Sequence, residues 1–112
     1  MIDESVIATL KGSLGDDDAV IRQLIGLYIS DSPPLVAGAV DALERRDMAS
    51  LARAAHSLKS TSASMGATTV SSLARELELH AKQNELALSA AVLERLKVEL
   101  NDAIAAFAKL KF

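Results

Sequence analysis

The chain contains no cysteine. This absence excludes disulfide frameworks, thiol nucleophiles and thiolate metal sites, and it fits a reducing compartment. Tryptophan is also absent, and the only aromatic residues are Tyr28, Phe107 and Phe112. Proteins that bind nucleic acid usually carry a basic stripe with stacking aromatic residues. Because lysine and arginine are scattered along the chain and the formal net charge is −3, we expect no nucleic-acid binding.

Long hydrophobic runs are missing as well. No segment approaches the roughly 20 apolar residues that cross a bilayer, so no membrane span is expected. The first residues, Met-Ile-Asp-Glu-Ser, lack the basic and apolar regions of a signal peptide. We therefore expect a cytoplasmic protein. Two histidines without a carboxylate-rich cluster predict no metal site. P-loop, G-x-S-x-G and H-E-x-x-H motifs are absent from the sequence too.

Aliphatic residues dominate the composition of the chain. Half of the residues are hydrophobic, mainly Ala, Leu, Val and Ile, which favours helices packed on helices. The length of 112 residues fits a single domain over residues 1–112. Apolar residues recur with helical spacing almost from end to end. The fold class expected is all-α, an antiparallel up-and-down four-helix bundle with a short additional N-terminal helix.

Capping residues and glycines predict where these helices begin and end. A short helix is expected over residues 3–14 with Asp3 as its N-cap. A longer helix begins within residues 16–18, where carboxylates favour a helix N-terminus. Its expected apolar positions are Val20, Leu24, Leu27, Leu35, Ala39 and Leu43. Pro33 and Pro34 favour a kink in this helix, and the alternative is a true break that Ser32 recaps.

The second half of the chain predicts three more helices. One runs from Met48 to Met65, with Asp47 as N-cap and Gly66 as the glycine that ends it. The next is capped by Thr68 or Thr69, and its apolar seam is Val70, Leu73, Leu77 and Ala81. A turn is expected at residues 84–85. The last helix is capped by Ser89, with Leu93, Leu96, Leu100, Ile104 and Phe107 facing inward.

His56 is predicted to face solvent. At about 100° per residue, Leu51, Ala55, Leu58, Ser62 and Met65 form one core stripe, and His56 lies about 140° away from it. Lys59 follows one turn later, where its ammonium reaches an anion held on the imidazole. Arg53 and Ser60 share the outer side, and Ala52 and Ala63 point near it. These small residues leave the histidine accessible to another protein.

Such an imidazole suits phosphoryl transfer. Neutral imidazole is a good nucleophile near pH 7 because its ordinary pKa is about 6.5. It can attack phosphorus and form an energy-rich N–P bond. Phosphoryl transfer mainly needs positioning and charge stabilisation. Lys59 supplies charge, and the hydroxyls of Ser60 or Ser64 can donate hydrogen bonds to phosphate oxygens.

The segment Ala55-His56-Ser57-Leu58-Lys59-Ser60, continued to Met65-Gly66-Ala67, resembles the signature of histidine-containing phosphotransfer (HPt) domains. That signature reads roughly A-H-x-L-K-G, then small and polar residues, then an apolar residue and G-A. The resemblance extends over nearly the whole chain. One position departs from it, because Ser60 stands where the family usually has glycine.

The resemblance implies a function. His56 would accept a phosphoryl group through Nε2 from a receiver-domain aspartate or a hybrid histidine kinase, and would pass it to a response regulator. Lys59 would stabilise that group, and Lys82 is a weaker candidate for the same role. The protein would be a carrier without ATP-dependent kinase activity. It would need no cofactor of its own, because the receiver would supply Mg²⁺. We expect a monomer.

Two other classes of protein also present a histidine on a helical surface. A histidine-kinase dimerisation domain also presents a histidine on a helical hairpin, but an acidic residue typically follows that histidine, whereas Ser57 follows His56 here. A purely structural bundle would carry His56 incidentally and would never hold phosphate. We interpret His80 as an ordinary surface residue, and Glu76 and Glu78 as solvated helix charges.

Overall fold

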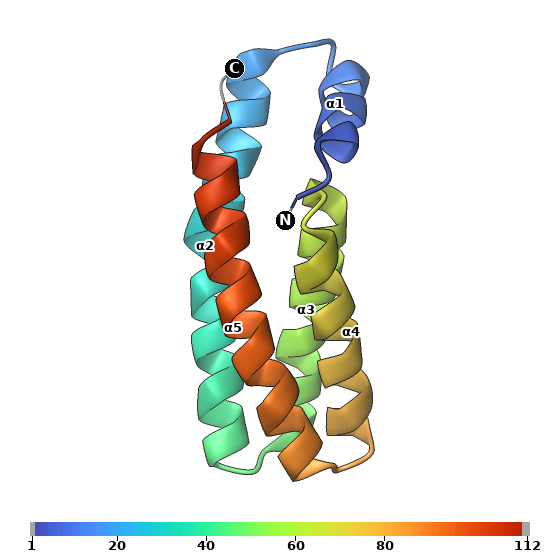
Figure 1. Ribbon diagram of the computed structural model, residues 1–112, viewed down its shortest axis with the longest axis vertical. Helices are drawn as coiled ribbons and strands as arrows, with labels where there is room; N and C mark the ends of the chain where they lie inside the picture. Colours follow the sequence, from blue (N-terminus) through green and yellow to red (C-terminus); the bar gives the residue numbers. More distant parts are fainter. Residues whose placement is uncertain (1, 111–112) are drawn as a thin grey trace.

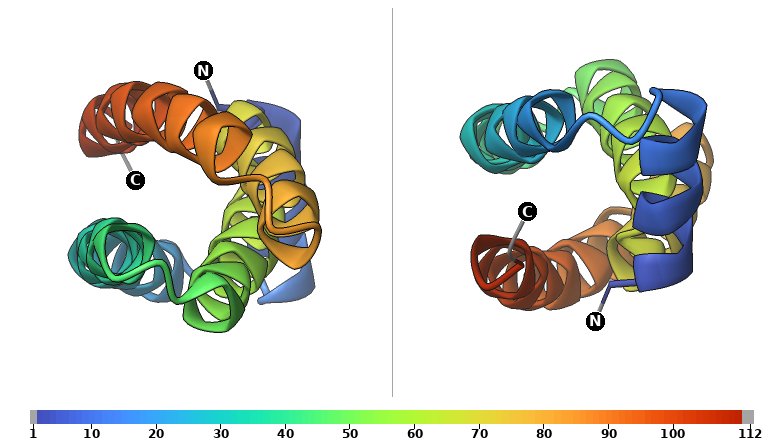
Figure 2. Two further views of the ribbon diagram at one scale, coloured as in Figure 1. Left: turned by 90° about the horizontal axis from the view of Figure 1, so that it is seen from below. Right: turned by 90° about the horizontal axis from the view of Figure 1, so that it is seen from above.

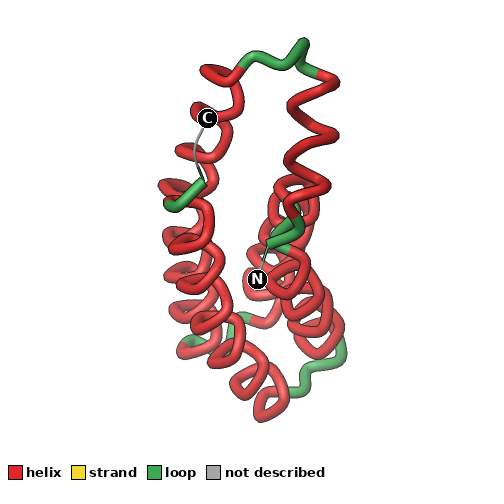
Figure 3. The backbone as a smooth tube through the Cα atoms, turned by 45° about the horizontal axis from the view of Figure 1, so that its top comes forward, coloured by secondary structure: helices red, strands yellow, loops and turns green. Residues whose placement is uncertain are grey.

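The computed structural model describes residues 2–110, which form five α-helices and no strand. Short loops join the helices (Figure 3). Their bounds are α1 Glu4–Ser13, α2 Asp18–Glu44, α3 Met48–Met65, α4 Thr68–Lys82 and α5 Leu86–Ala108. Helices α2 to α5 contact one another in a closed cycle and run alternately up and down (Figure 1). The expected four-helix bundle with one additional N-terminal helix is therefore confirmed.

Helix α2 is longer than its neighbour α3, and α1 packs beside the part of α2 that extends past the end of α3. With 27 residues, α2 extends beyond the end of α3, where α1 lies against both helices. Figure 2 shows α1 on the α3–α4 side of the bundle. The molecule measures 43 × 19 × 19 Å along its principal axes. None of the helices within residues 2–110 is long and apolar enough to cross a membrane.

Three predicted aspartate caps are present. The carboxylate of Asp3 accepts a hydrogen bond from the Ser5 amide at 3.0 Å, and Asp47 accepts one from the Ser50 amide at 3.1 Å. Asp17, within the predicted start of the second helix, accepts from the Ala19 amide at 2.9 Å. Each carboxylate satisfies an amide that has no partner inside its own helix.

Two other predicted caps are wrong. Helix α4 already begins at Thr68, with Ala67 at the cap position and no side-chain cap. The turn between α3 and α4 is too short to leave either threonine outside the helix. Helix α5 begins at Leu86, so Ser89 lies inside it and its amide bonds to the Glu85 carbonyl at 2.9 Å. The turn predicted at residues 84–85 is present, with Asn84 in the left-handed region at φ 56°.

Pro33 and Pro34 do not break α2, which is continuous from Asp18 to Glu44. Both prolines are exposed, so water can satisfy the carbonyls that lose an amide partner. Ser32 is buried inside the helix and recaps nothing. The expected apolar positions of α2 are confirmed in part, because Leu24, Leu35 and Leu43 pack partly buried against the core, whereas Leu27 is exposed. Of the expected positions only Ala39 is fully buried, and the buried residues are Ile21, Ile25, Tyr28, Ser32, Val36, Ala39 and Ala42.

The core stripes predicted for α3 and α4 are confirmed, since every residue named for them is buried. In α5, Leu93, Leu96, Leu100 and Phe107 are buried, and Ile104 packs partly buried against them. The ring of Phe107 meets that of Tyr28 edge to face, with centroids 5.3 Å apart. This contact joins α5 to α2 across the core.

Two buried serines predict opposite responses to the same substitution. Ser62 and Ser89 are both 0% exposed, but Ser62 Oγ shares a 2.7 Å hydrogen bond with Tyr28 Oη, whereas Ser89 Oγ has no partner within residues 2–110. Ser89→Ala should raise stability by up to about 1 kcal/mol, because it removes an unpaired buried hydroxyl. Ser62→Ala should lower stability by about 1–2 kcal/mol, because it weakens the pairing of the Tyr28 hydroxyl.

Urea unfolding of the two variants measures both effects, and each serves as the control for the other. Equal losses of stability in both variants would show that the Ser89 hydroxyl has a partner in solution.

Candidate functional site

The α3–α4 hairpin sets which residues face His56. Gly66 ends α3 in the left-handed conformation at φ 80°, and α4 starts two residues later. Because the hairpin is antiparallel and its turn is tight, residues equally distant from the turn lie side by side. Ser71 Oγ donates to the Lys59 carbonyl at 2.9 Å and holds the two helices in this register. The register brings the middle of α4 alongside His56.

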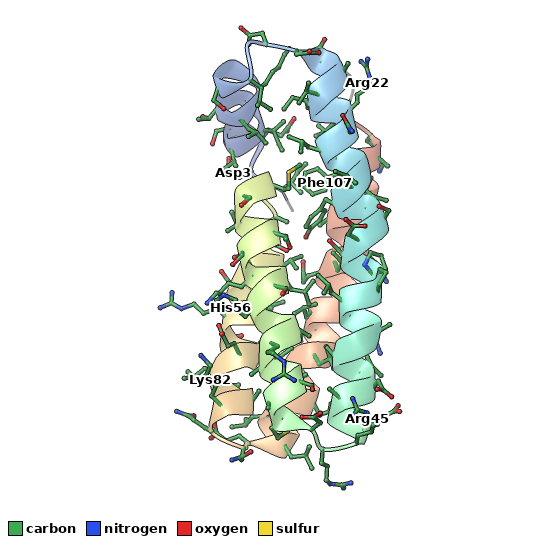
Figure 4. The ribbon with its side chains drawn as sticks, turned by 180° about the vertical axis from the view of Figure 1, so that it is seen from behind. Asp3, Arg22, Arg45, His56, Lys82 and Phe107 are labelled. Carbon is green, nitrogen blue, oxygen red and sulfur yellow. The ribbon has the colours of Figure 1, made fainter. Side chains whose placement is uncertain are left out.

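His56 stands on the outer surface, as predicted, and points away from α2 and α5 (Figure 4). Its side chain is 60% exposed. The ring is held on one side only, because Nδ1 lies 3.0 Å from Glu78 Oε2. An ionised carboxylate only accepts hydrogen bonds, so Nδ1 carries the proton and donates it. In the neutral ring Nε2 is then the unprotonated nitrogen and keeps its lone pair free.

Glu78 is the site residue that the sequence reading missed. Expected to be a solvated charge, its side chain is instead only 10% exposed and lies between three cationic or basic groups. Besides His56, it accepts a hydrogen bond from Lys59 Nζ at 2.7 Å and lies 3.3 Å from Lys82 Nζ. Glu76, two residues earlier, is exposed as expected. The register of the α3–α4 hairpin could have identified Glu78 from the sequence, because it places residue 78 across from residue 56.

These contacts keep Glu78 ionised. Chiefly the Lys59 ammonium, with help from Lys82 and His56, lowers the pKa of the Glu78 carboxyl to about 2 against the opposing effect of burial. A carboxyl with a lowered folded-state pKa stabilises the fold at pH values above its ordinary pKa. That contribution is lost as the pH falls from about 4.5 toward 2. At neutral pH the site therefore contains a permanent carboxylate beside the imidazole.

The predicted cations occupy different places around this carboxylate. Lys59 is 31% exposed and Lys82 is 66% exposed, so both ammonium groups are in reach of water. Figure 4 shows Lys82 on the same side of the molecule as His56. Arg53 is exposed, donates to Ser50 Oγ at 2.8 Å and lines an open hollow with His56, Glu78 and Lys82. The predicted grouping of cations near His56 is therefore present.

The small residues divide into two groups. Ser60 and Ala63 are exposed, as predicted for the cleared surface. Ala52 is buried at 9% exposure, although it still borders the hollow at His56, because it packs into the bundle at the edge of the core stripe. Ser64 does not join the site. Its hydroxyl donates to the Ser60 carbonyl at 3.0 Å, and it borders hollows beside α1 and α2 instead.

His80 is separate from this site. Its Nδ1 lies 2.9 Å from Glu85 Oε1, and its side chain is 23% exposed. The contact joins the end of α4 to the residue that precedes α5. His80 is therefore a structural residue of this turn, and its interpretation as an ordinary surface residue is corrected.

Comparison with known proteins agrees with this geometry. The model of the Hpt domain family matches residues 23–108. The chain is also similar to the crystal structure of histidine-containing phosphotransfer protein B from Pseudomonas aeruginosa PAO1, with a TM-score of 0.89 and 28% sequence identity. That match covers 96% of this chain and 91% of the other. No curated protein sequence matches significantly. With most of its length matched by the family model and an exposed histidine on the α3–α4 hairpin, the chain belongs to the Hpt domain family.

Proposed function

We propose that this protein carries phosphoryl groups in a phosphorelay and that His56 Nε2 is the acceptor atom. The observation that carries the proposal is the hydrogen bond from His56 Nδ1 to Glu78, combined with the 60% exposure of the ring. A carboxylate at Nδ1 selects the tautomer whose lone pair lies on Nε2. In this tautomer Nε2 is already able to attack phosphorus before a partner binds.

The transfer step needs no proton from His56 Nε2. The Nε2 lone pair attacks the phosphorus of an aspartyl phosphate, the new N–P bond forms, and the P–O bond to the aspartate breaks. The electron pair of that bond leaves with the aspartate carboxylate. The product is a phosphorylated imidazole that keeps its proton on Nδ1 and gains positive charge. Glu78, 3.0 Å from Nδ1, stabilises this charge as it develops.

Lys59 and Lys82 complement the other charge of the product. A phosphoryl group on Nε2 is anionic, and both ammonium groups lie within salt-bridge distance of Glu78, next to the ring. Lys59 follows His56 by three residues, a spacing that makes the two side chains neighbours on α3. We infer that Lys59 turns toward the phosphoryl group when it is present, while Lys82 continues to neutralise Glu78.

The composition of the hollow at His56 indicates which partners the protein needs. The hollow at His56 is open, and its lining within the described residues offers one nucleophile, one carboxylate and cations. We propose that the donor and the recipient are receiver domains of response regulators or of a hybrid histidine kinase, and that the receiver supplies Mg²⁺ and most catalytic groups. The protein itself carries phosphate without ATP-dependent activity. The bundle is completed by helices of one chain, which favours a monomer, and we place it in the cytoplasm.

Transfer from a receiver tests the proposal. Receiver domains from the same cell are loaded with radiolabelled phosphate, purified, and mixed singly with this protein. At least one should lose its label to the carrier within minutes. If the protein takes no label from any receiver or from phosphoramidate, the structural-bundle function is correct instead.

Lys59→Ala should slow transfer on the order of tenfold without unfolding the bundle, because it removes charge beside the phosphoryl group but leaves the core unchanged. Glu78 keeps His56 and Lys82 as partners. Lys97→Ala is the matched control, since it removes a lysine that pairs with Glu94 on α5, outside the site. Transfer rates and melting temperatures of both variants are compared. A sharply lower melting temperature for Lys59→Ala alone would show that Lys59 is mainly structural.

A further inference from the structure

Ser60 is the position where the chain departs from its family, and the structure gives its hydroxyl a place in the site. It follows His56 by four residues within the unbroken helix α3. Side chains four residues apart lie on one face of a helix, about 6 Å apart at Cβ. Helical side chains also lean toward the N-terminus. The Ser60 side chain therefore leans over the turn that carries His56.

Lys59 and Ser60 flank the imidazole from two sides. At about 100° per residue, Lys59 lies about 60° to one side of His56 and Ser60 about 40° to the other, both one turn toward the C-terminus. Lys59 is on the side of α4, where it bonds to Glu78. Ser60 is on the open side and is exposed. A phosphoryl group on the ring would thus have an ammonium on one flank and a hydroxyl on the other.

Two hydroxyls that follow Ser60 on α3 are already engaged. Thr61 Oγ1 donates to the Ser57 carbonyl at 2.9 Å, and Ser64 Oγ donates to the Ser60 carbonyl at 3.0 Å. This bond back to the preceding turn is the usual fate of a hydroxyl inside a helix. Among residues 2–110 the Ser60 hydroxyl has no such partner. It is free to donate to an incoming group.

We propose that the Ser60 hydroxyl donates a hydrogen bond to the phosphoryl group on His56, opposite Lys59, and so stabilises the phosphorylated carrier. This inference rests on the proposed function of His56. It also accounts for a serine where the family usually has glycine: a glycine leaves room for the donor aspartyl phosphate but binds nothing, whereas serine keeps most of that room and adds a ligand.

The test uses four variants, each loaded with phosphoramidate so that no receiver is needed for loading. Ser60→Ala and Ser60→Gly remove the hydroxyl, and Ser60→Thr keeps it. Ser64→Ala is the control, because Ser64 is an exposed serine on the same helix whose hydroxyl already donates to a backbone carbonyl and which lies outside the hollow at His56. Two quantities are measured: the equilibrium of phosphate exchange with one receiver, and the pKa of the phosphoryl group from its ³¹P resonance.

Loss of the hydroxyl should shift the equilibrium toward the receiver by about fivefold, the typical net effect of one hydrogen bond. The pKa of the phosphoryl group should rise in Ser60→Ala, because a donor to the dianion is gone. Ser60→Thr and Ser64→Ala should match the wild type. An unchanged Ser60→Ala, or a Ser60→Thr that behaves like it, overturns the inference. A wild type that takes no phosphate from phosphoramidate contradicts the proposed function itself.

Discussion

His56→Gln should take no phosphate from any donor, whether a phosphorylated receiver or phosphoramidate. Glutamine keeps a polar side chain at the surface but has no nitrogen lone pair that can attack phosphorus. Because the wild-type side chain is 60% exposed and outside the core, the variant should fold normally. Circular dichroism and thermal unfolding check the fold, and labelled phosphate checks the function. The expected effect is complete loss, because no other atom of the site is a nucleophile of this kind.

His80→Gln is the matched control for this variant. It removes the other histidine of the chain, whose Nδ1 contacts Glu85 at the start of α5. It should accept phosphate at the wild-type rate with at most a small loss of stability. The label on the wild type should be lost in acid and kept in base, as expected of an N–P bond. Label retained by His56→Gln would assign the acceptor to another residue.

Gly66→Ala should lower the free energy of unfolding by about 2–4 kcal/mol. Two effects combine at this residue. Its φ of 80° is strained for any residue with a Cβ, and a Cβ there would lie 2.6 Å from the Asp3 carbonyl oxygen and 3.0 Å from Val6 Cβ. The Gly66 carbonyl also accepts the Asp3 amide hydrogen bond at 2.7 Å. The substitution should therefore weaken both the end of α3 and the attachment of α1.

Gly15→Ala separates the two effects. Gly15 has nearly the same backbone angle, φ 74°, but nothing lies within 4 Å of the position of its Cβ. It should cost only the conformational penalty, about 1 kcal/mol. Urea unfolding gives the loss of stability in each variant. Hydrogen exchange at the α1 amides shows whether α1 detaches from the bundle. Equal losses in the two variants would mean that the close approach of Asp3 relaxes without cost.

The hairpin at the centre of the site was well predicted from the sequence. Asp47 and Gly66 mark both ends of α3, and its core stripe is regular because the outer face is polar or small. The same holds for the seam of α4. Where one face is clearly apolar, periodicity alone determines which side is buried.

Helix α2 was predicted less well for a physical reason. It carries apolar residues on more than one side, and Leu27 is 48% exposed while Ser32 is 2% exposed. Which side is buried depends on the helices packed against it, and those lie elsewhere in the chain. Glu78 was missed for the same kind of reason. Two of its three partners, His56 and Lys59, come from α3, which a wheel drawn for α4 alone does not include.

The single outward imidazole has a kinetic consequence for the proposed carrier. Donor and recipient must both reach the same nitrogen, so they compete for one docking position and never hold the carrier together. Each cycle then follows a ping-pong order, in which the first partner departs before the second binds. In such a cycle turnover cannot be faster than dissociation of each partner, so a very tight complex with either one would slow the relay. Selection on this surface therefore favours brief encounters over high affinity, and an excess of one unphosphorylated partner would slow delivery to the other.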